Sequence, residues 1–181
     1  MKDLSRRNVI FKSLLFLMTT AFVVAVTGCG GGGGGSSSGG GTAAAGTYNG
    51  TVTSTLSLSG VGSETITAAI GIQVRADGTV ALIPGVTGFS GSAVLNGNNF
   101  TIDVPASQLN DSELTCTGTI RFAGTIAGNT INGNTAGLNL RCNGRSFTLT
   151  GTFTLQRTAA ARTSSGSTLG ESIREAISTM L

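Results

Sequence analysis

Apolar and polar residues alternate with a period of two along most of the chain between residues 46 and 157. In one stretch, Ile66, Ile70 and Ile72 alternate with Thr65 and Thr67. Successive side chains of a β-strand point to opposite faces, so this alternation predicts strands with one apolar face and one polar face rich in threonine. The pattern predicts about eight strands, at residues 46–59, 63–75, 78–83, 87–95, 99–104, 113–126, 130–141 and 145–157.

Turn dipeptides separate the predicted strands. Asp77-Gly78, Asn96-Gly97 and Asn143-Gly144 are pairs favoured in two-residue hairpin turns, whose backbone needs a positive φ. Such short connections join antiparallel neighbours and leave no room for the crossover helices of a parallel sheet. The sequence therefore predicts an all-β fold with an antiparallel meander.

An eight-stranded meander can close into a small barrel or fold over as a β-sandwich. Several of the predicted strands are long, as the tilted strands of a barrel are. Gly50, Gly118, Gly124 and Gly151 occupy positions of the apolar face, where a strongly coiled strand has to bend. Both features favour a small closed or partly open barrel, and the β-sandwich stays as the alternative.

The C-terminal residues have a different pattern. Residues 158–166 form a linker of small residues, and residues 167–181 have the periodicity of a short amphipathic helix. Ser167 or Thr168 can cap this helix. Because so short a helix is marginal alone in water, we expect it to dock on the β domain, with a partner or a membrane as the alternative. Its apolar face consists of Leu169, Ile173, Ala176, Ile177 and Met180.

The N-terminus has the three parts of a signal peptide, predicted for residues 1–28. A basic segment precedes an apolar run at residues 13–26, which is too short for a comfortable membrane span. The run ends in Val26-Thr27-Gly28-Cys29, which resembles the lipobox of bacterial lipoproteins. The resemblance implies cleavage between Gly28 and Cys29 and acylation of Cys29.

Residues 29–45 comprise the lipidated cysteine and a Gly/Ser-rich stretch, which predicts a flexible tether reaching about 20 Å. Two acyl chains anchor a protein stably in a bilayer, whereas one gives only reversible binding. Gly30 follows Cys29 where inner-membrane lipoproteins of enterobacteria have Asp, so the resemblance implies a protein of the cell envelope in the outer membrane. Arg6-Arg7 also resembles a twin-arginine signal, which leaves the export route open.

The charge of the chain changes the picture of its partners. The formal net charge of +3 comes entirely from residues 1–28, and the later residues have seven Arg, seven acidic residues, no Lys and no His. A mature domain without net charge lacks the clustered basic residues that bind phosphates, so a nucleic-acid partner is excluded. The lack of histidine also excludes a Ser-His triad and a histidine-ligated metal.

Two further cysteines, Cys116 and Cys142, are expected to form a disulfide. If the strands on either side of Gly128-Asn129 pair, with one extra residue at that turn, the two cysteines face each other on the apolar side. Opposed Cβ atoms then lie about 4.5–5.5 Å apart, which a disulfide can bridge with slight adjustment. The oxidising compartments outside the cytoplasm permit a disulfide to form. A redox or metal pair is the alternative, but the sequence has neither a Cys-x-x-Cys motif nor a histidine.

These observations indicate three classes of function. The first is an envelope lipoprotein, anchored to the lipid bilayer through acylated Cys29, whose domain is a non-enzymatic structural or protein-binding module. The second is a small β-barrel that carries an apolar ligand in its apolar interior. The third is an enzyme, which the scattered acidic residues do not favour. No catalytic residue, metal site or cofactor is predicted.

Overall fold

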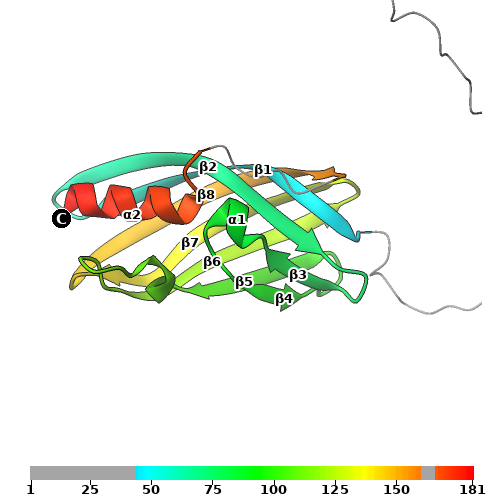
Figure 1. Cartoon of the computed structure of the whole chain (residues 1–181), viewed down its shortest axis with the longest axis horizontal. Coiled ribbons are helices and arrows are strands. Elements are labelled where there is room, and N and C mark those ends of the chain that lie inside the picture. Colours follow the sequence, from blue (N-terminus) through cyan, green and yellow to red (C-terminus); the bar gives the residue numbers. More distant parts are fainter. Residues whose placement is uncertain (1–43, 160–165) are drawn as a thin grey trace, which may run out of the picture. The chain divides into compact units, whose positions relative to one another are not determined.

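A computed structural model describes residues 44–159 and 166–181. The predicted signal peptide, Gly28, Cys29, nearly all of the tether and most of the linker lie outside the described residues. The described residues form a nearly closed antiparallel barrel with a helix at its side (Figure 1). The strands are β1 (Gly46–Leu58), β2 (Gly62–Val74), β3 (Thr79–Leu82), β4 (Ser92–Val94), β5 (Asn99–Pro105), β6 (Cys116–Ala127), β7 (Thr130–Cys142) and β8 (Arg145–Thr158).

The strands follow one another around the barrel in the order β4-β3-β2-β1-β8-β7-β6-β5. The first and last strands are therefore paired, with Val52 of β1 opposite Phe153 of β8. The sheet ends at β4 and β5, which are joined at one point where the backbones of Asn96 and Asn99 exchange two hydrogen bonds of 2.8 and 3.1 Å. The predicted fold class is confirmed, and the opening lies between two consecutive strands.

The apolar face predicted from the sequence points inward. Ile70, Phe122 and Phe153 are buried in one continuous core, whereas Thr150 and Thr152 are exposed. The core takes residues from every long strand, and the Phe89 and Phe122 rings lie with their centroids 6.0 Å apart. Burial of this surface is the main favourable contribution to folding.

Inward-facing glycines make room for large or polar neighbours in the barrel. A methyl group on Gly124 would lie 2.6 Å from the Phe100 ring, so glycine at this position lets the ring lie against the strand. Gly151 lies between Ser54 on one side and Thr135 on the other, and their hydroxyls form a buried hydrogen bond of 3.0 Å across it. The two buried hydroxyls thereby satisfy each other, which avoids the cost of an unpaired polar group.

The predicted strand at 87–95 is wrong in its first half. This segment begins in a one-turn helix, α1 (Pro84–Thr87), and only β4 is extended. Pro84 suits the first turn of a helix, and Gly88 ends it with a left-handed φ of 78°. The Thr87 hydroxyl lies 3.3 Å from both the backbone N and O of Gly71. α1 therefore supplies hydrogen-bond partners to backbone groups of β2 at a point where β3 no longer pairs with that strand.

The strand predicted at 113–126 begins only at Cys116, and a short 3₁₀ helix, η1 (Ala106–Leu109), precedes it. Cys116 pairs with Cys142 as predicted, but the extra residue that produces this register lies elsewhere. Ala127 pairs with Thr130 directly across the turn, so no extra residue lies there. The register shifts instead at a bulge in β7 near Asn139, whose φ is 52°. Asparagine tolerates this left-handed backbone better than most residues, and the bulge reverses which side chains of β7 face the core.

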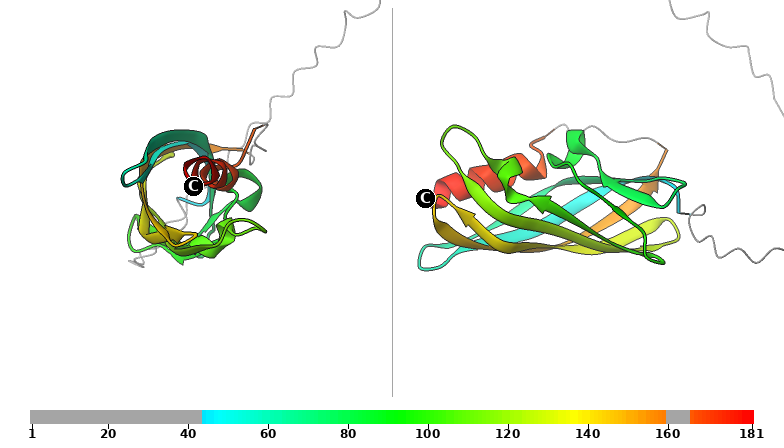
Figure 2. Two further views of the ribbon diagram at one scale, coloured as in Figure 1. Left: turned by 90° about the vertical axis from the view of Figure 1, so that its left-hand side faces the viewer. Right: turned by 90° about the horizontal axis from the view of Figure 1, so that it is seen from below.

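The helix α2 (Leu169–Met180) completes the barrel wall. β3 pairs with β2 only from Ile72 to Val74, so the remaining edge of β2 has no strand beside it. α2 lies along this edge, between β2 and η1, as the end-on view shows (Figure 2). Leu169, Ile173 and Ile177 are buried in the core of the barrel. The expectation that this helix docks on its own domain is confirmed.

A capping box begins α2. The Thr168 hydroxyl accepts a hydrogen bond of 3.2 Å from the backbone N–H of Glu171, and the Glu171 carboxylate accepts one of 2.7 Å from the N–H of Thr168. The bond from the Thr168 N–H, together with one of 3.0 Å from the Thr168 hydroxyl to the same carboxylate, lowers the pKa of the Glu171 carboxyl. No helix within the described residues combines the length and apolar character needed to cross a bilayer.

Replacing Thr168 with alanine is expected to lower the free energy of unfolding by about 1 kcal/mol, because the first turn of α2 loses its side-chain acceptor. Thr168→Ser keeps the hydroxyl and serves as the matched control. Urea denaturation of both variants measures the difference. An alanine variant as stable as the serine variant would show that the cap does not stabilise the docked helix.

Candidate functional site

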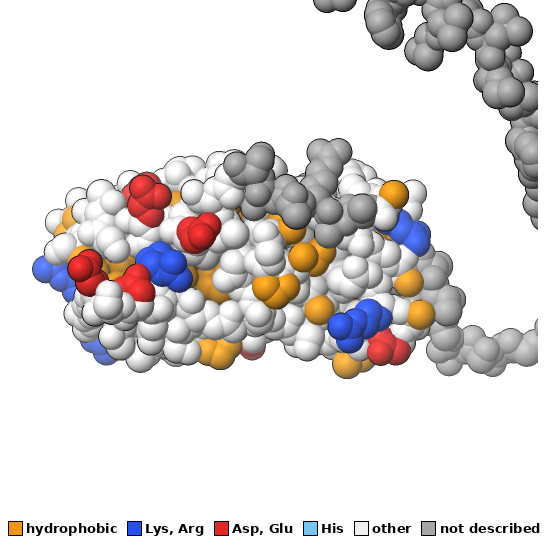
Figure 3. Space-filling view, in the orientation of Figure 1, with side chains coloured by type: hydrophobic (Ala, Val, Ile, Leu, Met, Phe, Trp, Pro, Cys, Tyr) orange, Lys and Arg blue, Asp and Glu red, His pale blue; other side chains and the backbone are white. Residues whose placement is uncertain are grey.

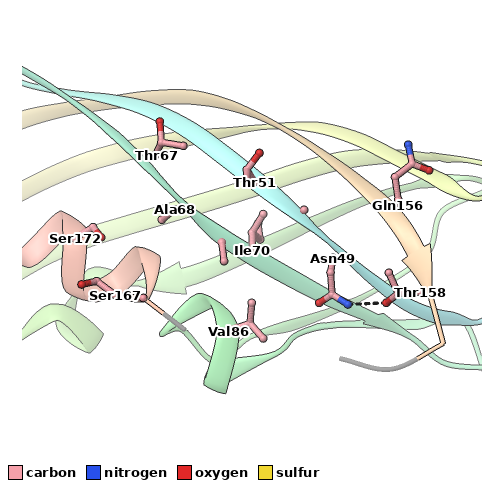
Figure 4. Close-up of a pocket in the computed structure, with 13 residues that line it drawn as sticks. Asn49, Thr51, Thr67, Ala68, Ile70, Val86, Gln156, Thr158, Ser167 and Ser172 are labelled. Carbon is pink, nitrogen blue, oxygen red and sulfur yellow. Dashed lines mark hydrogen bonds between the residues drawn. The ribbon is translucent and has the colours of Figure 1, made fainter. Parts of the chain in front are cut away.

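A groove of ≈ 820 Å³ runs over the outer face of β1, β2 and β8 and reaches α1 and α2. We call it the β1–β2 groove. Figure 4 shows Val86 approaching it from α1, and Ser167 and Ser172 from the region of α2. Its lining consists of Asn49, Gly50, Thr51, Thr67, Ala68, Ala69, Ile70, Val86, Gln156, Thr158, Gly166, Ser167 and Ser172.

The polar side chains that line the β1–β2 groove are all uncharged. The Asn49 amide donates a hydrogen bond of 2.7 Å to the Thr158 hydroxyl, which connects β1 to the end of β8 (Figure 4). Thr51 and Gln156 add a hydroxyl and an amide, and the half-buried Ala69 adds a small apolar portion. None of the described lining side chains ionises near neutral pH, so the groove offers hydrogen bonds and apolar contact to a ligand but no general acid or base.

Charged side chains lie elsewhere and interact mainly with the protein itself. In Figure 3 they form one group toward the left-hand end of the molecule, around α2, and a smaller group near the right-hand end, and much of the surface between the two is uncharged. Asp111 accepts hydrogen bonds of 2.8 Å from the backbone N–H groups of Glu113 and Leu114, which lower the pKa of its carboxyl. Its other oxygen lies 3.5 Å from Nε of Arg174 on α2. Among the described residues, no group of three or more Cys, Asp or Glu side chains could hold a metal ion.

The disulfide between Cys116 and Cys142 is present, with Cα atoms 4.1 Å apart and both residues buried. Neighbouring asparagines join it to the loop before β6. Asn110 accepts a hydrogen bond of 2.6 Å from the N–H of Cys116, and Asn143 accepts one of 2.9 Å from the N–H of Thr115. This arrangement gives the cysteine pair a structural role at one end of the barrel.

The sequence-predicted sites do not converge with the groove. Gly28 and Cys29 lie outside the described residues, and the disulfide joins β6 and β7, whereas the groove lies on β1, β2 and β8. The groove is not predicted by the sequence pattern, because the alternation assigns these outward side chains only to a polar face. A comparison with protein-family models found no match, and a search of curated proteins found no relative.

Proposed function

We propose that this chain is a lipid-anchored protein of the bacterial cell envelope whose β domain is a non-enzymatic structural or protein-binding module. The sequence Val26-Thr27-Gly28-Cys29 and the glycine-rich stretch behind it support the anchor. The buried disulfide suits a compartment outside the reducing cytoplasm. The outer membrane is the proposed location, because Gly30 follows the lipidated cysteine.

The packed interior of the barrel supports the proposal that the β domain is a structural or protein-binding module. The inward side chains of the barrel form one continuous cluster with those of α2, including the rings of Phe122, Phe147 and Phe153. A narrow barrel filled in this way has its recognition surfaces on the outside. This supports a module that binds through its outer face, and it argues against the alternative of an apolar ligand carried inside. The uncharged lining of the β1–β2 groove likewise gives the enzyme alternative no candidate acid or base.

The attachment point of the predicted tether is well defined. The Tyr48 hydroxyl donates a hydrogen bond of 2.9 Å to the carbonyl of Ala44, and the Arg157 guanidinium donates one to the carbonyl of Ala45. The Tyr48 hydroxyl also lies 3.4 Å from the carbonyl of Gly128 in the β6–β7 turn. The proposed anchor would therefore join the domain at the end opposite the disulfide, which would leave the disulfide end and the barrel sides open to a partner.

Replacing Cys29 with alanine is expected to abolish acylation, because the thiol that receives the lipid is lost. The uncleaved precursor should accumulate, and radiolabelled palmitate should not be incorporated. Mass spectrometry of the wild-type protein extracted from membranes should show a chain that begins at the acylated Cys29. Under native conditions the same sample should carry no apolar ligand at one-to-one stoichiometry.

Gly30→Ala is the matched control, since it changes the neighbouring residue and keeps the thiol. A Cys29→Ala protein that is still cleaved, acylated and membrane-bound would refute the lipid anchor. An apolar molecule retained by every wild-type protein would instead favour the carrier.

A further inference from the structure

A second hollow, of ≈ 420 Å³, lies on the outer face of β5, β6 and β7. We call it the β5–β7 hollow. Its volume falls within the range typical of small-molecule sites. It lies on a different part of the barrel wall from the β1–β2 groove. Its lining consists of Asn99, Phe100, Thr101, Ala123, Gly124, Thr125, Asn132, Gly133 and Asn134.

The strand register explains why the surface is hollowed there. Ala123 of β6 lies opposite Thr101 of β5 and Asn134 of β7. The next outward residue of β6, Thr125, lies opposite Asn99 and Asn132. The methyl group of Ala123 forms a low floor between side chains that are longer than its own. The Asn and Thr side chains around it have few rotatable bonds and stand on paired strands, so little conformational entropy is lost when they bind a ligand.

Hydrogen bonds hold two of the amides in place. The Thr125 hydroxyl donates to Oδ1 of Asn99 over 2.6 Å, and the Thr154 hydroxyl donates to Oδ1 of Asn132 over 3.0 Å. With its oxygen engaged, each amide keeps its N–H₂ group as a donor for a ligand. Asn134 is exposed and adds a third amide, and Thr101 adds a hydroxyl. The hollow thus presents neutral donors and acceptors beside apolar surface.

The nearest charges neutralise each other. Asp103 follows Thr101 on the outer face of β5, and Arg121 lies opposite it on β6. Two hydrogen bonds of 2.7 Å join the Arg121 guanidinium to the Asp103 carboxylate and lower the pKa of that carboxyl. Because the charges of Asp103 and Arg121 are paired with each other, neither is left to neutralise the charge of an ionic ligand in the hollow.

We propose that the β5–β7 hollow binds a neutral carbohydrate, such as a segment of an uncharged polysaccharide at the cell envelope. Sugar hydroxyls both donate and accept hydrogen bonds, which matches the mixture of fixed amide donors and threonine hydroxyls around the Ala123 floor. This site is independent of the proposed anchor, and it adds a ligand class to a module whose partner was expected to be a protein.

The test is native affinity electrophoresis of the full chain, extracted in a detergent without a sugar headgroup. The gels contain dextran, laminarin or mannan as neutral polysaccharides, or alginate as an acidic one. At least one neutral polysaccharide should retard the protein, and alginate should not. Ala123→Leu, which fills the floor, should weaken this binding about tenfold, and Asn134→Ala, which removes one amide, about threefold.

Ala136→Leu is the matched control, because it makes the same enlargement at an outward position of β7 beyond the hollow. It should bind like the wild type. Migration unaffected by every neutral polysaccharide would overturn the proposal, as would retardation by alginate alone. Equal retardation of Ala123→Leu and Ala136→Leu would also overturn it, since the carbohydrate would then bind elsewhere.

Discussion

Replacing Phe153 with alanine is expected to lower the free energy of unfolding by about 3–5 kcal/mol. Phe153 is 3% exposed and points into the barrel between Val52 and Gly133, its partners on the two neighbouring strands. Its ring lies over Gly133, where a methyl group would come 2.6 Å from Cε2. Removing the ring leaves a cavity that the paired strands on both sides prevent from collapsing. Chemical denaturation of the variant measures the loss.

Thr152→Ala is the matched control, because Thr152 is the adjacent residue of β8 and faces outward. Its substitution should change stability by no more than about 0.5 kcal/mol. A larger effect at Thr152 than at Phe153 would mean that the threonine face is the buried one. The packed interior, on which the proposed function rests, would then be refuted.

The second large effect is expected at the disulfide. Cys116→Ser should cost about 3 kcal/mol, because the bond restricts the unfolded chain around a long loop, with the cysteines 26 residues apart in sequence. The same substitution leaves Cys142 as a buried free thiol. Denaturation curves and thiol titration of the unfolded variant measure both consequences.

The double variant, with serine at both positions, separates loss of the cross-link from the effect of one unpaired thiol. Reduced wild-type protein should match its stability within about 0.5–1 kcal/mol. Titration of unfolded, unreduced wild-type protein should detect neither Cys116 nor Cys142. Detection of both would refute the disulfide and the register of β6 and β7.

The sequence predicted the strands well because alternation is a local property. In β2, Ile66, Ile70 and Ile72 are buried, whereas Thr65 and Thr67 are exposed, as their alternation predicts. The apolar periodicity that predicted α2 is equally local. Its docking on the domain was predicted because so short a helix is marginally stable alone in water. The one-turn helix α1 was missed because so few residues carry no periodicity, although Pro84 and Gly88 mark its two ends.

The parts that were missed depend on contacts between distant residues. The bulge at Asn139 changes the parity of the inward residues between Ile131 and Cys142, but the sequence of β7 does not locate the extra residue, which is defined by the pairing with β6 and β8. The β5–β7 hollow needs Thr101, Ala123 and Asn134 to lie in one rank across three strands. A polar face can be predicted from the sequence of one strand, but the positions of hollows on that face depend on how several strands are aligned with one another.

The pairing of β1 with β8 has a consequence for how the protein is made. The strand at the start of the domain has β2 as its local partner, but its other edge stays open until the last strand has been synthesised. Contacts of this kind, between residues far apart in the sequence, slow folding, because the chain must close a large loop before they form. Until β8 has been synthesised, the chain can form only the separate meanders β1–β4 and β5–β7, which lack the pairing that closes the barrel. We expect the domain to become resistant to protease in a single late step, once β8 and α2 have been synthesised.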